Sequence, residues 1–254
     1  EFRQQYRRDG KQVHPHVSIV MNFTPSTPDA PSLLTFDEVL TLLHEFGHAL
    51  HGLLSDVTYA SQSGTNVPRD FVELPSQLME NFATETHFLR HVAHHYQTDE
   101  VIPDSLVDAL KTSRTYLAAY ACIRQLSFGY IDMAWHTLKE PFDGSVEQFE
   151  RTVCQKTAFF QPTAGVCMST QFSHLFAGGY AAGYYGYKWA EVLDADAFAV
   201  FRAHGGISRE IGNRFRNCIL RKGGSEHPAH LYVAFKGSEP TIEALLKRDG
   251  IQGR

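Results

Sequence analysis

Apolar residues recur at the spacing of an α-helix between residues 36 and 53. The positions that carry this pattern are Val39, Leu40, Leu42, Leu43, Phe46 and Leu50, and residues three or four apart share one face of a helix. Just before them, Thr35 and Glu38 have the spacing of a capping box, which satisfies the first backbone N–H groups of a helix. The pattern therefore predicts a helix from about residue 36 to residue 53.

Most of the remaining apolar pattern is also helical. Further helices are expected over the ranges 69–95, 104–120, 122–138, 145–158, 172–202, 208–221 and 239–248. Pro75 falls early in the first of these ranges, where it either kinks the helix or marks its true start. The segment 17–23 is rich in β-branched residues and is expected to be a strand. We therefore expect a mainly α fold with a small β element near the N-terminus.

Composition narrows the class of protein. The chain has 254 residues, a length that fits one large domain or two small ones, and its hydrophobic content of 43% permits a full core. Its net charge is −5 and it has no large basic run, so binding to nucleic acid gets no support. No apolar run reaches the length of a membrane span, so no membrane partner is expected.

The cysteines are scattered and form no CxxC motif. They are Cys122, Cys154, Cys167 and Cys218. This pattern favours free thiols in a reducing, cytoplasmic compartment. Because an even number of cysteines also permits disulfides, a periplasmic location stays open.

The segment His44-Glu45-Phe46-Gly47-His48 lies inside the first predicted helix and is an HExxH motif. Residues four apart on a helix lie on one face, one turn apart, so both imidazoles can bind one metal ion. A catalytic zinc keeps an open position for water, and Glu45 could take a proton from that water. The motif predicts a zinc peptidase site with His44 and His48 as ligands and Glu45 as the catalytic base. The alternative is a pair of histidines that only make hydrogen bonds on a buried helix.

Glu73 is the candidate for the third ligand. It lies among apolar residues of the second predicted helix, where a buried carboxylate needs a neutralising partner such as a metal ion. A surface glutamate on an amphipathic helix is the alternative. His51 and the cluster His91, His94 and His95 are weaker candidates, and Gln77 is the candidate hydrogen-bond partner of a ligand. One Zn²⁺ per chain is expected, although Mn²⁺ or Co²⁺ could use the same ligands.

Together, three segments resemble the M3 family of zinc metallopeptidases. They are residues 44–51 (HEFGHALH), 63–77 (SGTNVPRDFVELPSQ) and 176–187 (FAGGYAAGYYGY). The last two are most similar to the peptidyl-dipeptidase (Dcp) branch, and the resemblance runs from about residue 17 to the C-terminus. It implies a zincin-like helical catalytic domain that hydrolyses short peptides, with zinc on His44, His48 and Glu73 and with Glu45 as general base. Because chains of this family are considerably longer, residues 1–254 are expected to be a C-terminal catalytic region that lacks the N-terminal helical region.

The resemblance also implies which residues bind the substrate. His174, Tyr180, Tyr184 and Tyr187 match residues that line the substrate cleft, and the loop with Gly64 and Thr65 would offer backbone groups to an extended peptide. Phenol and imidazole donors suit the negative charge that builds on a carbonyl oxygen during hydrolysis. The alternatives are a small-residue helix face with its tyrosines toward solvent, and an ordinary turn at residues 63–66.

Two cutting patterns and one non-catalytic role stay open. Release of C-terminal dipeptides, the activity we expect, needs a cation for the peptide carboxylate, and Arg69, Arg114 and Lys188 are candidates. An endo-acting oligopeptidase of the same family needs no such cation. A non-catalytic zinc- or peptide-binding fragment would bind without turnover.

Overall fold

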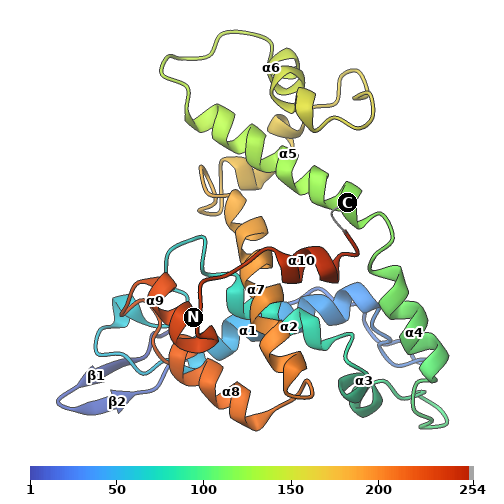
Figure 1. Cartoon of the computed structure of the whole chain (residues 1–254), viewed down its shortest axis with the longest axis vertical. Helices are drawn as coiled ribbons and strands as arrows, with labels where there is room; N and C mark the ends of the chain where they lie inside the picture. Colours follow the sequence, from blue (N-terminus) through green and yellow to red (C-terminus); the bar gives the residue numbers. More distant parts are fainter. Residues whose placement is uncertain (252–254) are drawn as a thin grey trace.

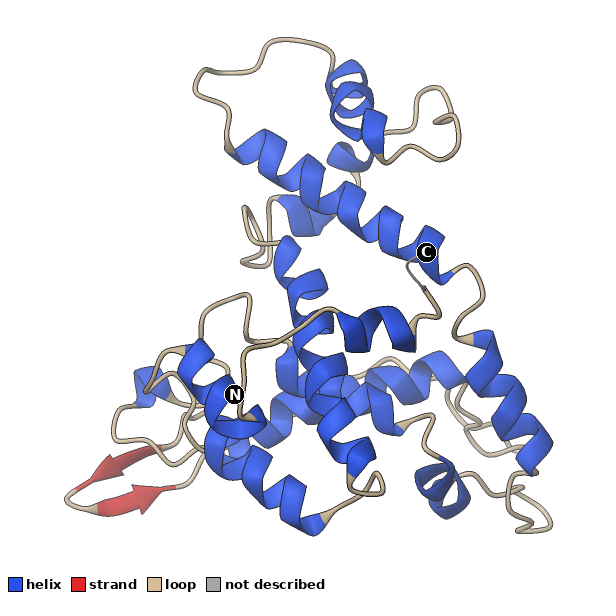
Figure 2. Ribbon diagram, viewed as in Figure 1, coloured by secondary structure: helices blue, strands red, loops and turns tan. Residues whose placement is uncertain are grey.

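The computed structural model describes residues 1–251, which are mainly helical (Figure 1, Figure 2). The α-helices are α1 (Phe36–Leu54), α2 (Leu74–Phe82), α3 (Thr86–Val92), α4 (Asp104–Ser113), α5 (Ala118–His136), α6 (Val146–Val153), α7 (Tyr185–Ala203), α8 (Arg209–Phe215), α9 (Pro228–Lys236) and α10 (Glu243–Arg248). A π-helical turn, Arg216–Leu220, continues α8. Short 3₁₀ turns cover Ala60–Gln62, Cys154–Lys156, Met168–Thr170 and Ser173–Leu175. Strands β1 (Tyr6–Arg8) and β2 (Lys11–Val13) form an antiparallel hairpin. The expected mainly α fold with a small β element near the N-terminus is confirmed.

The hydrophobic core joins α2 to the helices of the C-terminal part of the chain. Its buried side chains include Phe71, Leu74, Leu78, Leu193, Phe198, Phe201, Ile211, Phe215, Ile219, Leu231, Tyr232 and Phe235. Figure 1 places α1, α2 and α7 together in the main body, while α5 and α6 extend away from it. Because α2 packs against both α1 and α7, it is held on two sides.

Local sequence signals account for α1. The Thr35 side chain accepts a hydrogen bond from the Glu38 N–H, and the Glu38 side chain accepts one from the Thr35 N–H, so the predicted capping box is confirmed. The helix covers the predicted range to within one residue. The HExxH motif therefore lies in its interior, where helical geometry sets the spacing of the side chains.

The expected helix over residues 69–95 is two shorter helices. Residues 70–73 form a turn, α2 begins at Leu74, and Pro75 lies in its first turn, where a missing N–H removes no hydrogen bond. Pro75 thus marks the start of the helix and does not kink it. The break between α2 and α3 at residues 83–85 contains no glycine or proline from which it could be predicted.

The strand predicted over residues 17–23 is wrong. Alternate residues there are exposed, as in a strand, but within residues 1–251 this segment pairs with no other strand. An extended segment becomes a strand only through hydrogen bonds to a neighbour. The β hairpin lies earlier, where Asp9 and Gly10 both have positive φ and form its turn.

Other helix boundaries depart from prediction at residues with left-handed backbone. Leu117 (φ 54°) separates α4 from α5, and Gly178, Gly179 and Ala182 (φ 75°, 79° and 55°) prevent a helix before Tyr185. Helix α9 was not predicted from the sequence, although Pro228 in its first turn and Gly237 just after its end are start and stop signals.

The structure bears on two further predictions, the state of the cysteines and the presence of membrane-spanning helices. All four cysteines are free, as expected. Among residues 1–251, no helix combines the length and the apolar character that crossing a membrane would require.

Candidate metal centre

The crossing of α1 and α2 brings the three predicted metal ligands together. His44 and His48 lie one turn apart on α1, with ring centres 5.0 Å apart. The carboxylate of Glu73, at the start of α2, lies between them. Its Oε2 atom is 3.3 Å from His44 Nε2 and 3.1 Å from His48 Nε2. Among residues 1–251, no other three His, Cys, Asp or Glu side chains bring their ligand atoms this close.

Gly47 allows this close crossing. A Cβ atom at its position would lie 2.5 Å from the Pro75 carbonyl oxygen and 2.5 Å from Ser76 Cα. Both are backbone atoms at the start of α2, so no side-chain rotation would make room. The glycine inside the HExxH motif is therefore what lets α2 approach the face of α1 that carries the histidines.

The geometry fits a tetrahedral metal site. Zinc with bonds of about 2.0–2.1 Å keeps neighbouring ligand atoms about 3.3 Å apart, close to the separations between Glu73 and the two imidazoles. Two imidazoles and one carboxylate are also a donor set that leaves a fourth position open. His44, His48 and Glu73 could therefore hold a zinc ion.

Hydrogen bonds fix the orientation of His44 and Glu73, whereas His48 Nδ1 has no hydrogen-bond partner among the described residues. Glu80, two turns after Glu73 on α2, lies 2.6 Å from His44 Nδ1. Ser76 Oγ donates to Glu73 Oε2 at 2.8 Å, and the Tyr180 hydroxyl donates to Glu73 Oε1 at 2.6 Å. The predicted partner Gln77 has a different contact, since its side-chain N–H donates to a backbone carbonyl of α7. Glu80 was not predicted from the sequence, although its place seven residues after Glu73 puts both on one side of α2.

The charges of the ligand set stabilise one another. Burial alone would lower the pKa of His44, but the hydrogen bonds to Glu73 and Glu80 raise it to about 10. Burial alone would raise the pKa of Glu73, but His44, His48 and Tyr180 hold it well below its usual range. Since metal-binding imidazoles must be neutral, a divalent cation at this site would take the place of imidazole protons.

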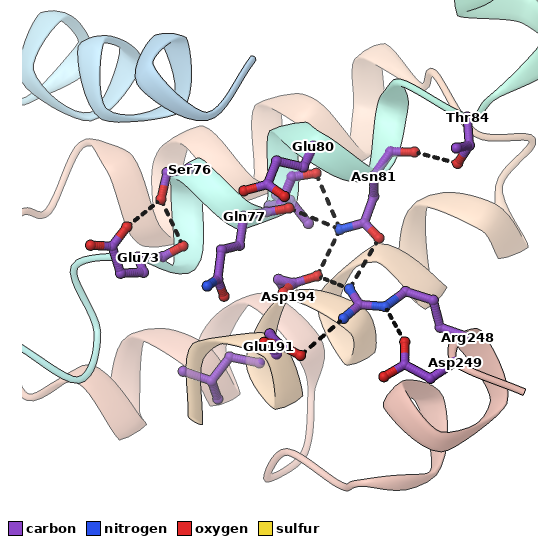
Figure 3. A network of polar contacts seen from close by, with 12 residues as sticks. Glu73, Ser76, Gln77, Glu80, Asn81, Thr84, Glu191, Asp194, Arg248 and Asp249 are labelled. Atoms are coloured by element: carbon purple, nitrogen blue, oxygen red, sulfur yellow. Dashed lines mark hydrogen bonds and ion pairs between the residues drawn. The ribbon is translucent and has the colours of Figure 1, made fainter. Parts of the chain in front are cut away.

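Polar contacts continue from Glu73 along α2 to Asp194 of α7 and to Arg248 and Asp249 at the end of α10 (Figure 3). The Asn81 side-chain N–H donates to Asp194 of α7 at 2.7 Å, and Arg248 of α10 pairs with the same carboxylate at 2.5 Å. Asp194 is buried. This network ties α2 to α7 and α10, so the helix that carries Glu73 is held along its length.

Glu45 and His51 lie on α1 with the histidine ligands. Glu45 is half-buried and directly follows His44. His51 is fully buried, and neither of its ring nitrogens has a hydrogen-bond partner among the described residues. Burial, with a smaller contribution from His48, lowers its pKa to about 3, so the ring is neutral. The structure does not include His51 in the ligand cluster.

The structure brings three of the predicted substrate residues together near Glu73. The rings of Tyr180 and Tyr187 stack with centres 4.8 Å apart, and His174 lies 5.6 Å from Tyr180. Burial, and then the hydrogen bond to Glu73, raises the pKa of Tyr180, so its hydroxyl stays a donor. Tyr184 differs, because it is buried and its hydroxyl donates to Gln125 at 2.8 Å. A direct contact of Tyr184 with substrate stays a prediction that this burial does not favour.

The loop with Gly64 and Thr65 packs near the C-terminal end of α1. The N–H of Gly64 donates to Ser55 Oγ at 2.6 Å, and a Cβ at Gly64 would lie 2.9 Å from Gly52 Cα, one turn past His48. Thr65 is half-buried. Because the Gly64 N–H is already used, only the carbonyl groups of this loop and the N–H of Thr65 could serve a peptide.

Comparison with known proteins agrees with this geometry. Residues 2–251 match Peptidase family M3. Oligopeptidase A of Salmonella typhimurium is 42% identical over 98% of this chain and 37% of its own length. The probable cytosolic oligopeptidase A of Arabidopsis thaliana is 43% identical over 93% of this chain and 35% of its own length.

The comparison does not favour the Dcp branch that the sequence pattern had indicated. Dipeptidyl carboxypeptidase of Escherichia coli is 39% identical over 94% of this chain and 36% of its own length, and its identity is slightly below that of the two oligopeptidase A proteins named above. The chain spans a little more than a third of the length of these relatives. The match over nearly all of its length shows that this chain belongs to peptidase family M3.

Proposed function

We propose that residues 1–254 form the catalytic region of a zinc-dependent peptidase that hydrolyses short peptides. The observation that carries this proposal is that His44 Nε2 and His48 Nε2 both lie within 3.3 Å of Glu73 Oε2, with the half-buried Glu45 next to His44 in the chain. Membership of peptidase family M3 supports it. The relatives named oligopeptidase A and dipeptidyl carboxypeptidase support peptides as the substrate class.

Each residue of the site has a role in this proposal. His44, His48 and Glu73 hold one zinc ion, which when bound supplies a Lewis acid that lowers the pKa of water and polarises a peptide carbonyl. Glu45 takes a proton from the attacking water and delivers it to the departing amine. His174, and Tyr180 once its hydroxyl turns from Glu73 to the substrate, donate hydrogen bonds to the carbonyl oxygen as it gains negative charge, and losing one such donor costs about 10²–10³ in rate.

Metal analysis and peptide cleavage test the proposal together. The wild-type chain is expected to bind one zinc ion and to cleave a short peptide. Glu45→Gln should keep the zinc and lose about 10²–10⁴-fold in kcat, because the variant cannot accept the proton. His44→Ala, as the matched control, should lose both zinc and activity. A Glu45→Gln protein that holds zinc and cleaves at the wild-type rate would disprove the role of this base.

We further propose release of C-terminal dipeptides as the cutting pattern. Of the three candidate cations, Arg69 contacts a residue of the site, since its Cζ atom lies 5.0 Å from the centre of the Tyr180 ring. Lys188 is paired with Glu191, and Arg114 donates to Thr84 Oγ1. Arg69 is therefore the cation best placed to receive a peptide carboxylate. A free-acid peptide should be cleaved faster than its C-terminal amide; equal rates would favour an endo-acting oligopeptidase.

The length of the relatives supports one alternative. Because the chain covers a little more than a third of them, a region that binds zinc or peptide without turnover stays a candidate. It predicts full zinc occupancy with no product from the wild-type chain. Turnover that is lost in Glu45→Gln would dismiss it.

We also propose a cytoplasmic location. The four free cysteines and the relative named probable cytosolic oligopeptidase A support a reducing compartment. Fractionation of the cells that make the protein tests this, and recovery from the periplasm would contradict it.

A further inference from the structure

Asp132, on α5, is a fully buried carboxylate that was not predicted as a site residue. Its Oδ1 atom accepts the backbone N–H of Ala182 at 2.9 Å, and its Oδ2 atom accepts that of Tyr184 at 2.9 Å. His136, one turn later on α5, places its Nδ1 atom 2.7 Å from the Asp132 backbone carbonyl oxygen, its hydrogen-bond partner, and 2.9 Å from Oδ1. The two hydrogen bonds from backbone N–H groups to the carboxylate are charge-assisted, and such bonds are what makes a buried carboxylate tolerable.

The two amides belong to a loop of residues 176–184, which we name the Tyr180 loop. Its backbone is unusual, because Ala182 has a φ of 55°, a left-handed conformation that alanine rarely adopts. Such a residue persists only where its surroundings hold it. Asp132 supplies that hold by binding the N–H groups on both sides of Gly183.

The same loop reaches the ligand set at its other side. Tyr180 lies two residues before Ala182, and its hydroxyl donates to Glu73 Oε1 at 2.6 Å. Arg69 lies against the Tyr180 ring, and a Cβ at Gly179 would approach Arg69 Nη2 to 3.0 Å. The position of the Tyr180 hydroxyl therefore depends on a backbone that Asp132 fixes from α5.

We propose that Asp132 is the positioning residue of the Tyr180 loop. Its carboxylate holds the backbone of residues 182–184 so that the Tyr180 hydroxyl reaches Glu73. The contacts of the Asp132 carboxylate are with Ala182, Tyr184 and His136 and not with a metal-binding residue, so it acts through Tyr180. This inference rests on the proposed peptidase function, which it deepens by connecting a residue of α5 to the site.

Amide hydrogen exchange in the zinc-free protein tests the anchor without reference to activity. In Asp132→Asn, one acceptor oxygen becomes an N–H₂ group, so one of the two loop amides loses its partner. Exchange at Ala182 or Tyr184 should become about 10–100-fold faster. The matched control is Asp108→Asn, the same change at an exposed position of α4, which should leave both rates unchanged. Wild-type exchange in Asp132→Asn would overturn the proposal.

Peptide cleavage by the zinc-loaded protein tests whether the anchor acts through Tyr180. Asp132→Asn should lower kcat by about 10–100-fold, as expected for a residue that orients a site group. The double variant with Tyr180→Phe should lose no more than Tyr180→Phe alone, because residues that act through one group are not additive. Losses that multiply would overturn the proposal, since they would mean that Asp132 acts independently of the hydroxyl.

A second pair of variants covers the case in which Asp132→Asn does not fold. Ala182→Pro, at an exposed position, removes the N–H that Asp132 accepts and cannot adopt a positive φ. Ala182→Gly keeps the N–H and tolerates the conformation. The proline variant should show the loss of kcat and the glycine variant should not; wild-type kcat in Ala182→Pro would contradict the inference. If the wild-type protein binds zinc but cleaves nothing, the proposed function fails, whereas hydrogen exchange still decides whether Asp132 holds the loop.

Discussion

Replacement of Gly47 by alanine tests how the two helices assemble the ligand set. The added Cβ would lie 2.5 Å from the Pro75 carbonyl oxygen, 2.5 Å from Ser76 Cα and 2.8 Å from the Pro75 carbonyl carbon. Non-bonded carbon atoms touch at about 3.5–4.0 Å, so α1 and α2 would have to separate by about 1 Å. Since all the opposing atoms are backbone, the helices themselves must move.

Two opposing contributions decide the stability of Gly47→Ala. Alanine is favoured over glycine in a helix interior by about 1 kcal/mol. Overpacking a close contact costs about 1–3 kcal/mol. The free energy of unfolding should therefore fall by up to about 2 kcal/mol, a modest change.

Zinc affinity should respond more strongly than stability. Glu73 directly precedes α2, and Ser76 Oγ donates to its Oε2 atom, so a displacement of Pro75 and Ser76 moves the carboxylate with them. Metal–ligand distances tolerate deviations of only about 0.2 Å. We expect zinc affinity to fall by at least about 10–100-fold, the loss typical when groups that orient the ligands are disturbed.

Urea unfolding of the zinc-free protein and chelator competition for zinc measure the two effects. Gly129→Ala is the matched control, because Gly129 lies inside α5 and a Cβ there would meet nothing within 4 Å. The control should gain about 1 kcal/mol and keep its zinc affinity. If Gly47→Ala is stabilised as much as Gly129→Ala and binds zinc as tightly as the wild type, the reasoning about the helix crossing is refuted.

Three further substitutions test single contacts. Glu80→Gln removes the charge beside His44 Nδ1 and should weaken zinc binding by about 10–100-fold; an unchanged affinity in chelator competition would contradict that role. Tyr184→Phe should cost about 1 kcal/mol in urea unfolding, through the lost hydrogen bond to Gln125, with kcat/KM unchanged; a loss of activity without a loss of stability would place the hydroxyl on the substrate. His51 has a pKa of about 3 when folded and about 6.5 when unfolded, so the unfolded chain binds more protons between these values and stability falls by about 1.4 kcal/mol per unit as pH drops below 6.5. His51→Leu should remove this contribution to the pH dependence of the unfolding free energy, measured by urea unfolding of the zinc-free protein at several pH values. The same pH dependence in the variant and the wild type would rule out the contribution of His51.

What the sequence could predict of the site follows from how local each contact is. His44 and His48 lie in one helix whose capping box and apolar face can be predicted from neighbouring residues. Their spacing in the fold therefore follows from their spacing in the chain. Glu73 could be predicted only from the resemblance and from its apolar neighbours, because its place depends on where α2 crosses α1. The contact that permits this crossing, at Gly47, has no signal in hydrophobic periodicity.

Contacts between segments far apart in the chain could not be predicted from the sequence. The burial of Tyr184 and the hydrogen bonds of Asp132 join α5 to a loop some fifty residues later, and no local pattern announces either. The strand expected over residues 17–23 failed for the same reason, because β-branched composition indicates an extended segment but not a partner for it. The helix expected over residues 172–202 failed where Gly178, Gly179 and Ala182 turn to positive φ.

The contacts around the ligand set come from two sources that can fail separately. Glu80 and Ser76 lie on α2 with Glu73, so a movement of α2 carries the ligand and its partners together and disturbs mainly their distance from α1. Tyr180 comes from a loop anchored on α5, so it can leave Glu73 while α1 and α2 stay in register. The helix crossing therefore governs whether a metal ion binds, whereas the loop governs how well Glu73 and the substrate are oriented once it does. If these two roles are separate, Gly47→Ala should lose zinc affinity and Asp132→Asn should lose kcat.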